Sequence, residues 1–224
     1  MMSNEPVPVS LHRGGANYPG RLLTLLDDQA PARVQVLGDE RMLTQVDGGT
    51  LRSLAIVASR SCSDSMKNSC LNLIREISST GVVLLGGFHS PLEKCCLEAA
   101  LKANMSIVIW LARSLDRFRL PSSWLRGLIS GQLVIVSAQG PGQKRPTVAT
   151  ARFRNRCVAA MSDSVFIIHA KAQGKTEALC HEIASWNKPW FGLDSGLNEL
   201  LLSIRRRQEG REGLPAETKT QSAT

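Results

Sequence analysis

The feature that most constrains this chain is a series of short, wholly apolar segments that alternate with segments of helical periodicity. The apolar segments predict buried strands over residues 54–58, 81–85, 106–111, 132–137, 164–169 and 190–193. The residues between them predict helices over 64–79, 91–103, 121–130, 147–161 and 176–186. Strands that are apolar on both faces and separated by helices are typical of a parallel sheet covered on both sides. We therefore expect an α/β fold with a doubly wound, mostly parallel sheet.

One helix start carries a specific signal, Ser90-Pro91-Leu92-Glu93. Serine is a favoured N-cap, proline fits the first helical position, and glutamate at the third position completes a capping box. We expect a helix to begin directly after Ser90.

The chain has 224 residues, enough for one domain with small extensions. Residues 1–50 are expected to form an N-terminal arm and extension, with a loose arm over 1–20, a short helix over 21–28 and a small strand over 33–37. The α/β domain is expected over 51–207 and closes with a helix over 196–207. Residues 208–224 are polar and are expected to be disordered.

The charge balance favours a polyanionic partner. There are 27 Lys and Arg against 19 Asp and Glu, a formal net charge of +8. A basic tail containing Arg205-Arg206-Arg207 is the alternative source of this excess. The rest of the chain stays positive without that cluster, which favours a binding surface.

Cysteine usage points to a reducing compartment. The six cysteines form no C-x-x-C pair, and a zinc site would need ligands clustered at short spacing. We expect buried free thiols and a cytoplasmic protein without metal or cofactor. No apolar run approaches the ~20 residues that span a membrane, and residues 1–10 lack the features of a signal peptide.

Residues 152–192 carry the main functional signal. A basic helix start precedes the strand 164–169, and the turn Gln173-Gly174-Lys175-Thr176 opens the next helix. Backbone N–H groups at such a helix start favour an anion, and arginines beside an aromatic residue suit a nucleic-acid strand. On a helix, Arg152 and Arg156 share one face while Arg154 points elsewhere, so the three cannot all contact one strand. Core packing is the alternative role for Phe153, and holding a loop is the alternative for Asn155.

Several motifs, in the right order, resemble the DprA/Smf family of DNA-processing proteins. Residues 57–63 (V-A-S-R-S-C-S) are similar to V-G-S-R-x-x-S, and residues 86–101 resemble S-G-x-A-x-G-I-D…A-H…A-L. Residues 115–137 are similar to G-L-D-x-x-Y-P…L…G-x-L-x-S-E. Phe153-Arg154-Asn155-Arg156 and the residues up to 163 resemble F-x-x-R-N-R-x-I-A-G-L-S. The resemblance covers about residues 18–193.

This resemblance implies an extended Rossmann-like fold for the domain of residues 51–207. It also implies a non-enzymatic protein, without a cofactor, that binds single-stranded DNA and passes it to a RecA-type recombinase, notably in natural transformation. A homodimer is implied as well. With the anion-site argument, it gives these candidate DNA- and phosphate-binding residues: Ser59, Arg60, Ser61, Gly86, Gly87, Arg152, Phe153, Arg154, Asn155, Arg156, Gly174, Lys175 and Thr176.

The chain departs from the family pattern at several positions. Ala58 replaces the glycine before S-R, and Ala138 replaces the glutamate after the fourth strand. The aspartate and histidine of the G-I-D…A-H element are interpreted as lost. These changes put the working of the DNA pocket in question.

Two other functions remain open. A nucleotide-sensing domain would bind one small phosphorylated ligand at the Gly174 turn. A nucleoside monophosphate N-glycosidase of the LOG type would need P-G-G-x-G-T-x-x-E, but Glu177 follows Thr176 directly, and the required position is Leu179. Such an enzyme would depend on Glu177 or Glu182.

Overall fold

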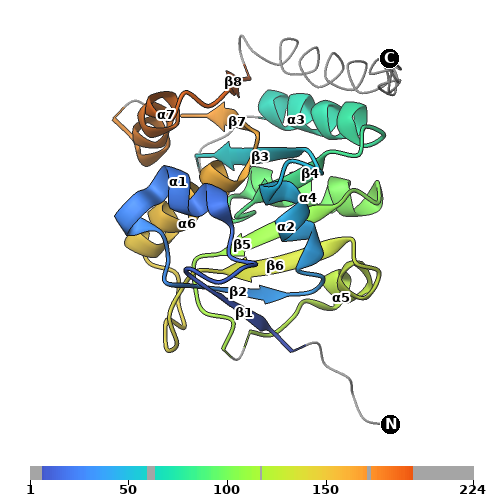
Figure 1. Ribbon diagram of the computed structural model, residues 1–224. Helices are drawn as coiled ribbons and strands as arrows, with labels where there is room; N and C mark the ends of the chain where they lie inside the picture. The colour runs from blue at the N-terminus through green and yellow to red at the C-terminus, as the bar shows by residue number, and fades with distance from the viewer. Residues whose placement is uncertain (1–6, 60–63, 117, 171–172, 194–224) are drawn as a thin grey trace, which may run out of the picture.

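The computed structural model describes residues 7–59, 64–116, 118–170 and 173–193. Within them, eight strands form one sheet in the order β1-β2-β6-β5-β4-β3-β7-β8 (Figure 1). The strands β3 to β8 are parallel to one another, whereas β2 pairs antiparallel with both β6 and β1. The strands are β1 (Val9–His12), β2 (Arg33–Leu37), β3 (Ser53–Ala58), β4 (Val83–Gly86), β5 (Ile107–Leu111), β6 (Leu133–Ser137), β7 (Ser164–His169) and β8 (Trp190–Gly192).

The sheet is doubly wound, as predicted. From β3 the chain adds β4, β5 and β6 on one side, then crosses back to add β7 and β8 on the other. In open α/β sheets, ligands bind outside the carboxyl ends of the strands where the winding reverses. Here that point lies between β3 and β7, whose ends are held together by a hydrogen bond from Ser59 N to His169 O of 3.0 Å.

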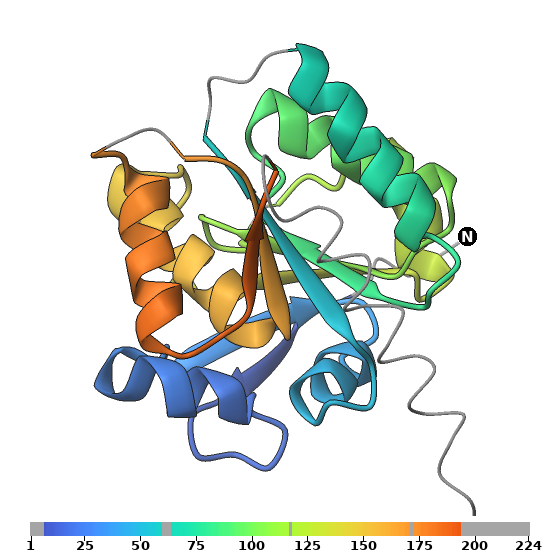
Figure 2. The ribbon, with the colours of Figure 1, turned by 90° about the horizontal axis from the view of Figure 1, so that it is seen from above.

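Helices cover both faces of the sheet (Figure 2). The first, second, sixth and seventh helices pack on one face, and the third, fourth and fifth on the other. The helices predicted up to residue 186 and the strands predicted from residue 33 onward agree with the observed bounds to within two residues, whereas the second helix, α2, was not predicted. The helices are α1 (Gly20–Leu26), the 3-10 turn η1 (Asp27–Gln29), α2 (Arg41–Asp47), α3 (Asp64–Ile77), α4 (Pro91–Lys102), α5 (Ser122–Ile129), α6 (Val148–Met161) and α7 (Lys175–Ser185).

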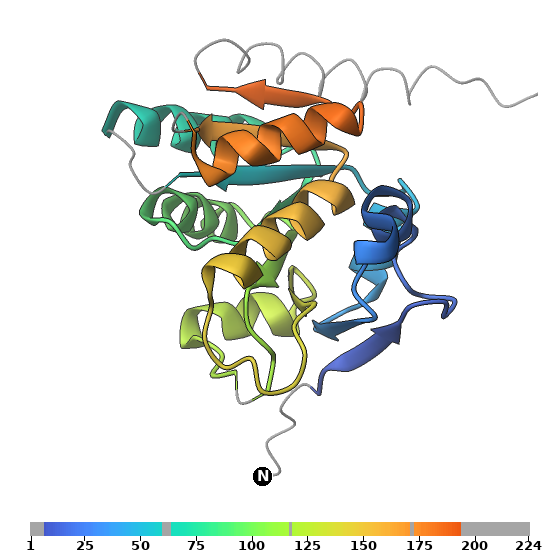
Figure 3. The same ribbon diagram turned by 90° about the vertical axis from the view of Figure 1, so that its left-hand side faces the viewer.

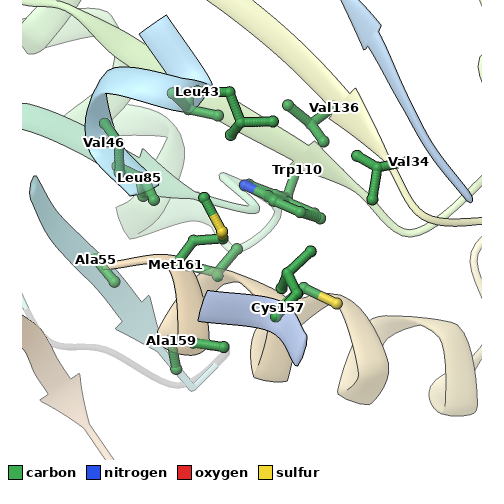
Figure 4. Packing of buried hydrophobic residues seen from close by; sticks show 14 of the residues in the cluster. Val34, Leu43, Val46, Ala55, Leu85, Trp110, Val136, Cys157, Ala159 and Met161 are labelled. Atoms are coloured by element: carbon green, nitrogen blue, oxygen red, sulfur yellow. The ribbon is translucent and has the colours of Figure 1, made fainter. Parts of the chain in front are cut away.

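The two-sided burial explains the continuous apolar runs. In β5, Val108 and Trp110 enter the core under α6, while Ile107 and Ile109 enter the core on the opposite face. Figure 4 shows the indole of Trp110 packed beside Met161. All four strand residues have no exposed surface, so a run of apolar side chains on both faces is what this strand requires.

The N-terminal region differs from expectation. The loose arm predicted over residues 1–20 is wrong from Val9 onward, because β1 pairs with β2 and Tyr18 is buried. The strand β1 was missed since it lies at the sheet edge and buries only Leu11, which leaves almost no apolar pattern. The short helix α2 was also missed. The proposed division at residue 50 stays a prediction.

The remaining expectations have mixed outcomes. Cys70, Cys96 and Cys157 are free and buried, and Cys95 and Cys180 are free and half-buried, whereas Cys62 lies outside the described residues. In the described part of the chain, no group of side chains is suited to a metal ion, and no helix has the length and apolarity to cross a membrane. The predicted helix over 196–207 and the tail over 208–224 lie outside the described residues.

Candidate nucleic-acid interface

Most of the predicted site residues that the structure describes lie at or near the edge of the sheet where the parallel strands end, here called the carboxyl edge (Figure 1). Ser59 follows β3, and Gly86-Gly87 end β4. The basic residues 152–156 lie in the second and third turns of α6, and residues 174–176 open α7. Arg60 and Ser61 lie outside the described residues, so their phosphate-binding role stays a prediction.

Arg154 lies beneath the carboxyl edge rather than on its surface. Its side chain is buried, and the residue is 6% exposed. Its Nε donates to Asn155 Oδ1 at 2.7 Å, and its Nη1 donates to the carbonyl of Trp110 at 3.4 Å. Burial lowers the pKa of Arg154, and the nearby carboxylate of Glu93 opposes this shift. This placement agrees with the helical spacing, which separates Arg154 from the outward face.

Gly87 provides the space that the Arg154 guanidinium occupies. A Cβ atom added at Gly87 would lie 1.7 Å from Nη1 and 2.0 Å from Cζ of Arg154. A Cβ atom at Gly86 would lie 2.9 Å from the ring of Phe88. The left-handed residue of this turn is Phe88, with φ of 46°. Packing therefore explains both glycines, and their predicted anion contacts remain a prediction.

Glu93 is the central residue that the sequence interpretation missed. Its carboxylate accepts backbone N–H groups from Ala58 at 3.0 Å, His89 at 2.8 Å and Ser90 at 3.0 Å. Counted along S-G-x-A-x-G-I-D from Gly86, the aspartate position falls on Glu93, so the acid is kept and only lengthened by one methylene. The interpretation that this acid is lost is therefore wrong. Counting positions along the motif from Gly86 would have identified Glu93 as the family acid from the sequence alone.

The other residues of the basic helix start face different surroundings. Arg156 forms an ion pair with Glu182 at 2.6 Å and donates to Gln29, so it ties α6 to α7 and η1 (Figure 3). Arg152 is exposed. Phe153 is half-buried and packs against the core. The family motif places its phenylalanine three residues before Arg154, where Ala151 stands, so Phe153 is not at the motif position.

The turn before α7 presents a cation at the carboxyl edge. Lys175, the first helical residue, is exposed, while Thr176 is buried. The left-handed residue is Gln173, with φ of 57°, and its N–H donates to Glu177 Oε2 at 2.6 Å. Gly174, the N-cap, has an extended backbone with φ of −93°. The turn is thus held by Glu177, and the N-terminal amides of α7 face the edge.

Further cations at this edge were missed. Arg113 and Arg119 follow β5, and Lys144 and Arg145 follow β6. Arg119, Lys144 and Arg145 are exposed, and Arg113 is half-buried. Their position in the loops that follow buried strands was the signal, because such loops meet at one edge of a parallel sheet.

Comparisons with known proteins place the chain in a family. The family described as DNA recombination-mediator protein A matches residues 10–183. No curated protein sequence matches the chain. DNA processing protein A (DprA) of Streptococcus pneumoniae is 21% identical, with a TM-score of 0.68, over 87% of this chain and 69% of that one. DNA processing protein A of Helicobacter pylori, a structure described for its single-stranded DNA binding mode, is 23% identical with a TM-score of 0.66. That match covers 92% of this chain and 95% of the relative.

At these identities the two structures establish a shared fold. The family match covers well over half of the chain and agrees with the order of the sequence motifs. This chain therefore belongs to the DNA recombination-mediator protein A family.

Proposed function

We propose that this protein binds single-stranded DNA along the carboxyl edge, across the crevice between the β3 and β7 loops. The observation that carries the proposal is the pair of exposed cations, Arg152 and Lys175, in the first two turns of α6 and α7, two helices that begin at the carboxyl edge after β6 and β7. Helix N-termini add partial positive charge at the same edge. Family membership supports a DNA strand as the anion.

The binding mechanism is electrostatic and independent of base sequence. Phosphates would contact Arg152, Lys175, the amides of the α7 turn and Arg60. Glu93 accepts a backbone N–H at the end of β3, and Arg154, from α6, contacts Gly87 after β4 and the carbonyl of Trp110 in β5, so the two residues hold these strand ends from below. Arg156 contributes less to the strand, because Glu182 neutralises it. Ser59, Ser61, Gly174 and Thr176 complete the candidate set.

Family membership supports a proposal for the wider role. We infer that the protein delivers the bound strand to a RecA-type recombinase during DNA uptake or recombination, in the cytoplasm and as a homodimer. A pull-down tests the interaction with the recombinase, and a measurement of molecular mass in solution tests the homodimer.

The enzyme alternative has weaker structural support. Glu182 is ion-paired with Arg156, and Glu177 accepts the Gln173 N–H, so both carboxylates that an N-glycosidase would use are engaged. The experiment described next distinguishes a nucleotide-sensing function from binding of a DNA strand.

The test is fluorescence anisotropy with a labelled single-stranded oligonucleotide at several salt concentrations. The variant Arg152→Ala/Lys175→Ala should weaken binding roughly tenfold or more, and should lower the salt slope by about 1.4, since each phosphate contact to a single strand contributes about 0.7. Arg60→Ala should weaken binding further. The matched control is Arg75→Ala/Lys102→Ala, which removes two cations from the last turns of α3 and α4, at the opposite edge.

Three results would contradict the proposal. The wild type could fail to bind the oligonucleotide, or the control could lose as much affinity as the carboxyl-edge variant. Displacement by a nucleoside monophosphate alone would instead indicate a nucleotide sensor.

A further inference from the structure

We propose that Cys70 and Cys96 are a redox-modification site, at which a hydroperoxide links α3 to α4 by a disulfide bond. This inference is independent of the proposed function. The two residues lie in the core on the face of the sheet that α3, α4 and α5 cover, away from the exposed cations of the candidate interface. We call this pair the core dithiol.

The core dithiol joins two helices that pack side by side (Figure 2). Cys70 belongs to α3 and Cys96 to α4, and both thiols are free. Cys70 is 1% exposed, and Cys96 has no exposed surface. The thiol of Cys96 donates a hydrogen bond to the sulfur of Cys70. Two cysteines can be bridged without backbone movement only where their side chains point toward each other, and this contact meets that condition.

Packing keeps the two sulfur atoms together. Leu73 and Ile74 on α3 and Leu97 on α4 belong to the same core cluster as the dithiol, and each is buried. Side chains in such a core occupy fixed rotamers with few voids. The folded protein should therefore direct oxidation to this one pairing of thiols.

The two thiols differ in acidity, which assigns their roles. The hydrogen bond from Cys96 lowers the pKa of Cys70, and burial opposes this shift. The same hydrogen bond and burial raise the pKa of Cys96, and the nearby carboxylate of Glu93 adds to the increase. The thiolate is the form that attacks an oxidant. Cys70 is therefore the attacking thiol, and Cys96 is the resolving thiol.

The reaction consumes one hydrogen peroxide for each bond formed. The thiolate of Cys70 attacks one peroxide oxygen, the O–O bond breaks, and the departing hydroxide takes up the proton that Cys70 has lost. Cys70 then carries a sulfenic acid. The sulfur of Cys96 attacks Cys70 Sγ, the S–O bond breaks, and the departing hydroxide leaves with the Cys96 proton. The two thiols lose two electrons, and the peroxide is reduced to two molecules of water.

Cys70 lies near the rim of the core, which gives a small oxidant a route to it. Residues 65–69, at the start of α3, are exposed or half-buried, and Cys70 is the first buried residue after them. On α4, Cys95 is half-buried beside Cys96. Burial of both sulfur atoms should make the reaction slower than oxidation of a surface thiol.

The bond would fix α3 to α4 one turn from the Glu93 carboxylate. Cys96 follows Glu93 by three residues, so the two share a face of α4, and Glu93 holds the Ala58 N–H at the end of β3. The bond also constrains the unfolded chain, so the thermal midpoint Tm should rise by roughly 5–10 °C. In a reducing environment such bonds are transient, and the stabilisation should reverse when a thiol reductant is added.

The experiment treats the folded wild type with hydrogen peroxide, blocks the remaining thiols with iodoacetamide in denaturant, and maps tryptic peptides without reduction. Trypsin leaves Cys70 in the peptide 68–75, and it leaves Cys95 and Cys96 together in the peptide 95–102. The two peptides should be joined, with a mass below their sum by two hydrogen atoms. The link should persist in Cys95→Ser, raise Tm in both proteins, and disappear with dithiothreitol.

The matched control is the same treatment in urea, where the six cysteines should give a mixture of pairings. No substitution in the core dithiol is needed, so the test does not depend on how such a variant folds. Failure of the two peptides to join in the folded wild type would refute the proposal. The same holds if the link is lost in Cys95→Ser, which would identify Cys95 as the partner, or if the folded protein gives the mixture seen in urea. A linked protein with an unchanged Tm would overturn the predicted stabilisation.

Discussion

Gly87→Ala should destabilise the protein by about 3 kcal/mol, and it should do so only when Arg154 is present. The added Cβ would lie 1.7 Å from Arg154 Nη1, so the guanidinium must leave its position. It would then lose its hydrogen bonds to Trp110 and Asn155, and hydrogen bonds of charged donors contribute about 1.5–3 kcal/mol each. Disrupting one side of a buried charged cluster costs about 3–5 kcal/mol. The 3.4 Å length of the Trp110 bond places our value at the low end.

The dependence on Arg154 can be measured with a double-mutant cycle. Arg154→Ala alone should cost a similar amount, because Glu93 and the Trp110 carbonyl lose the same neighbour. Adding Gly87→Ala to Arg154→Ala should cost about nothing, since the clash is gone. The coupling energy is therefore expected at about 3 kcal/mol in favour of the double variant, at the upper end of the usual range of about 0.5–3 kcal/mol for contacting residues.

Urea denaturation followed by tryptophan fluorescence measures all four corners of this cycle. Gly140→Ala is the control, because a Cβ there meets nothing within 4 Å and the residue is not left-handed. Its free energy of unfolding should stay equal or rise by about 0.4–1 kcal/mol. Additive costs for Gly87→Ala and Arg154→Ala would refute the argument that the glycine exists to admit the guanidinium.

Two further predictions concern the amino end of α4 and the far end of α6. Ser90→Ala removes the acceptor for the Glu93 N–H from a complete capping box, and should cost about 1 kcal/mol in the free energy of unfolding; an unchanged value would show that Glu93 alone fixes this helix start. Lys188 donates to the carbonyls of Ala160 and Ser162, and burial lowers its pKa from 10.5 to about 8. Between pH 8 and 9 the unfolded chain thus holds more protons than the folded one, so this group should make stability rise by about 1 kcal/mol. Above pH 9 the raised pKa of Cys157, about 12, acts in the opposite direction. Lys188→Met should remove the rise between pH 8 and 9, and an unchanged pH profile would contradict the shift.

The sheet was predictable because its strands are buried on both faces. A run such as 164–169 has apolar residues at adjacent as well as alternate positions, so it does not fit a strand or helix with one exposed face. Helices with clear periodicity lie between these runs. The strand β1 was not predictable, because an edge strand with one buried side chain carries no comparable pattern. The helix α2 was missed as well; its seven residues give barely two turns, a short segment in which to recognise a helical repeat.

The candidate site was predictable in location and not in arrangement. Placing Gly86, Arg154 and Lys175 after strands of a parallel sheet brought them to one edge. Sequence spacing also separated Arg154 from Arg152 and Arg156. It did not reveal that Gly87 and Arg154 are in contact, because they lie far apart in the chain and meet only when α6 crosses the end of β4.

The amino-acid sequence by itself determined the α/β class, the parallel sheet and the family, because apolar periodicity and local motifs are properties of short segments. The tertiary structure decided which cations face solvent and which are buried. Arg152, Arg154 and Arg156 look equivalent in the sequence. One is exposed, one is buried against Gly87, and one is paired with Glu182. The physical reason is that the free energy of a charge depends on its solvation and its neighbours, and these come from segments distant in the chain.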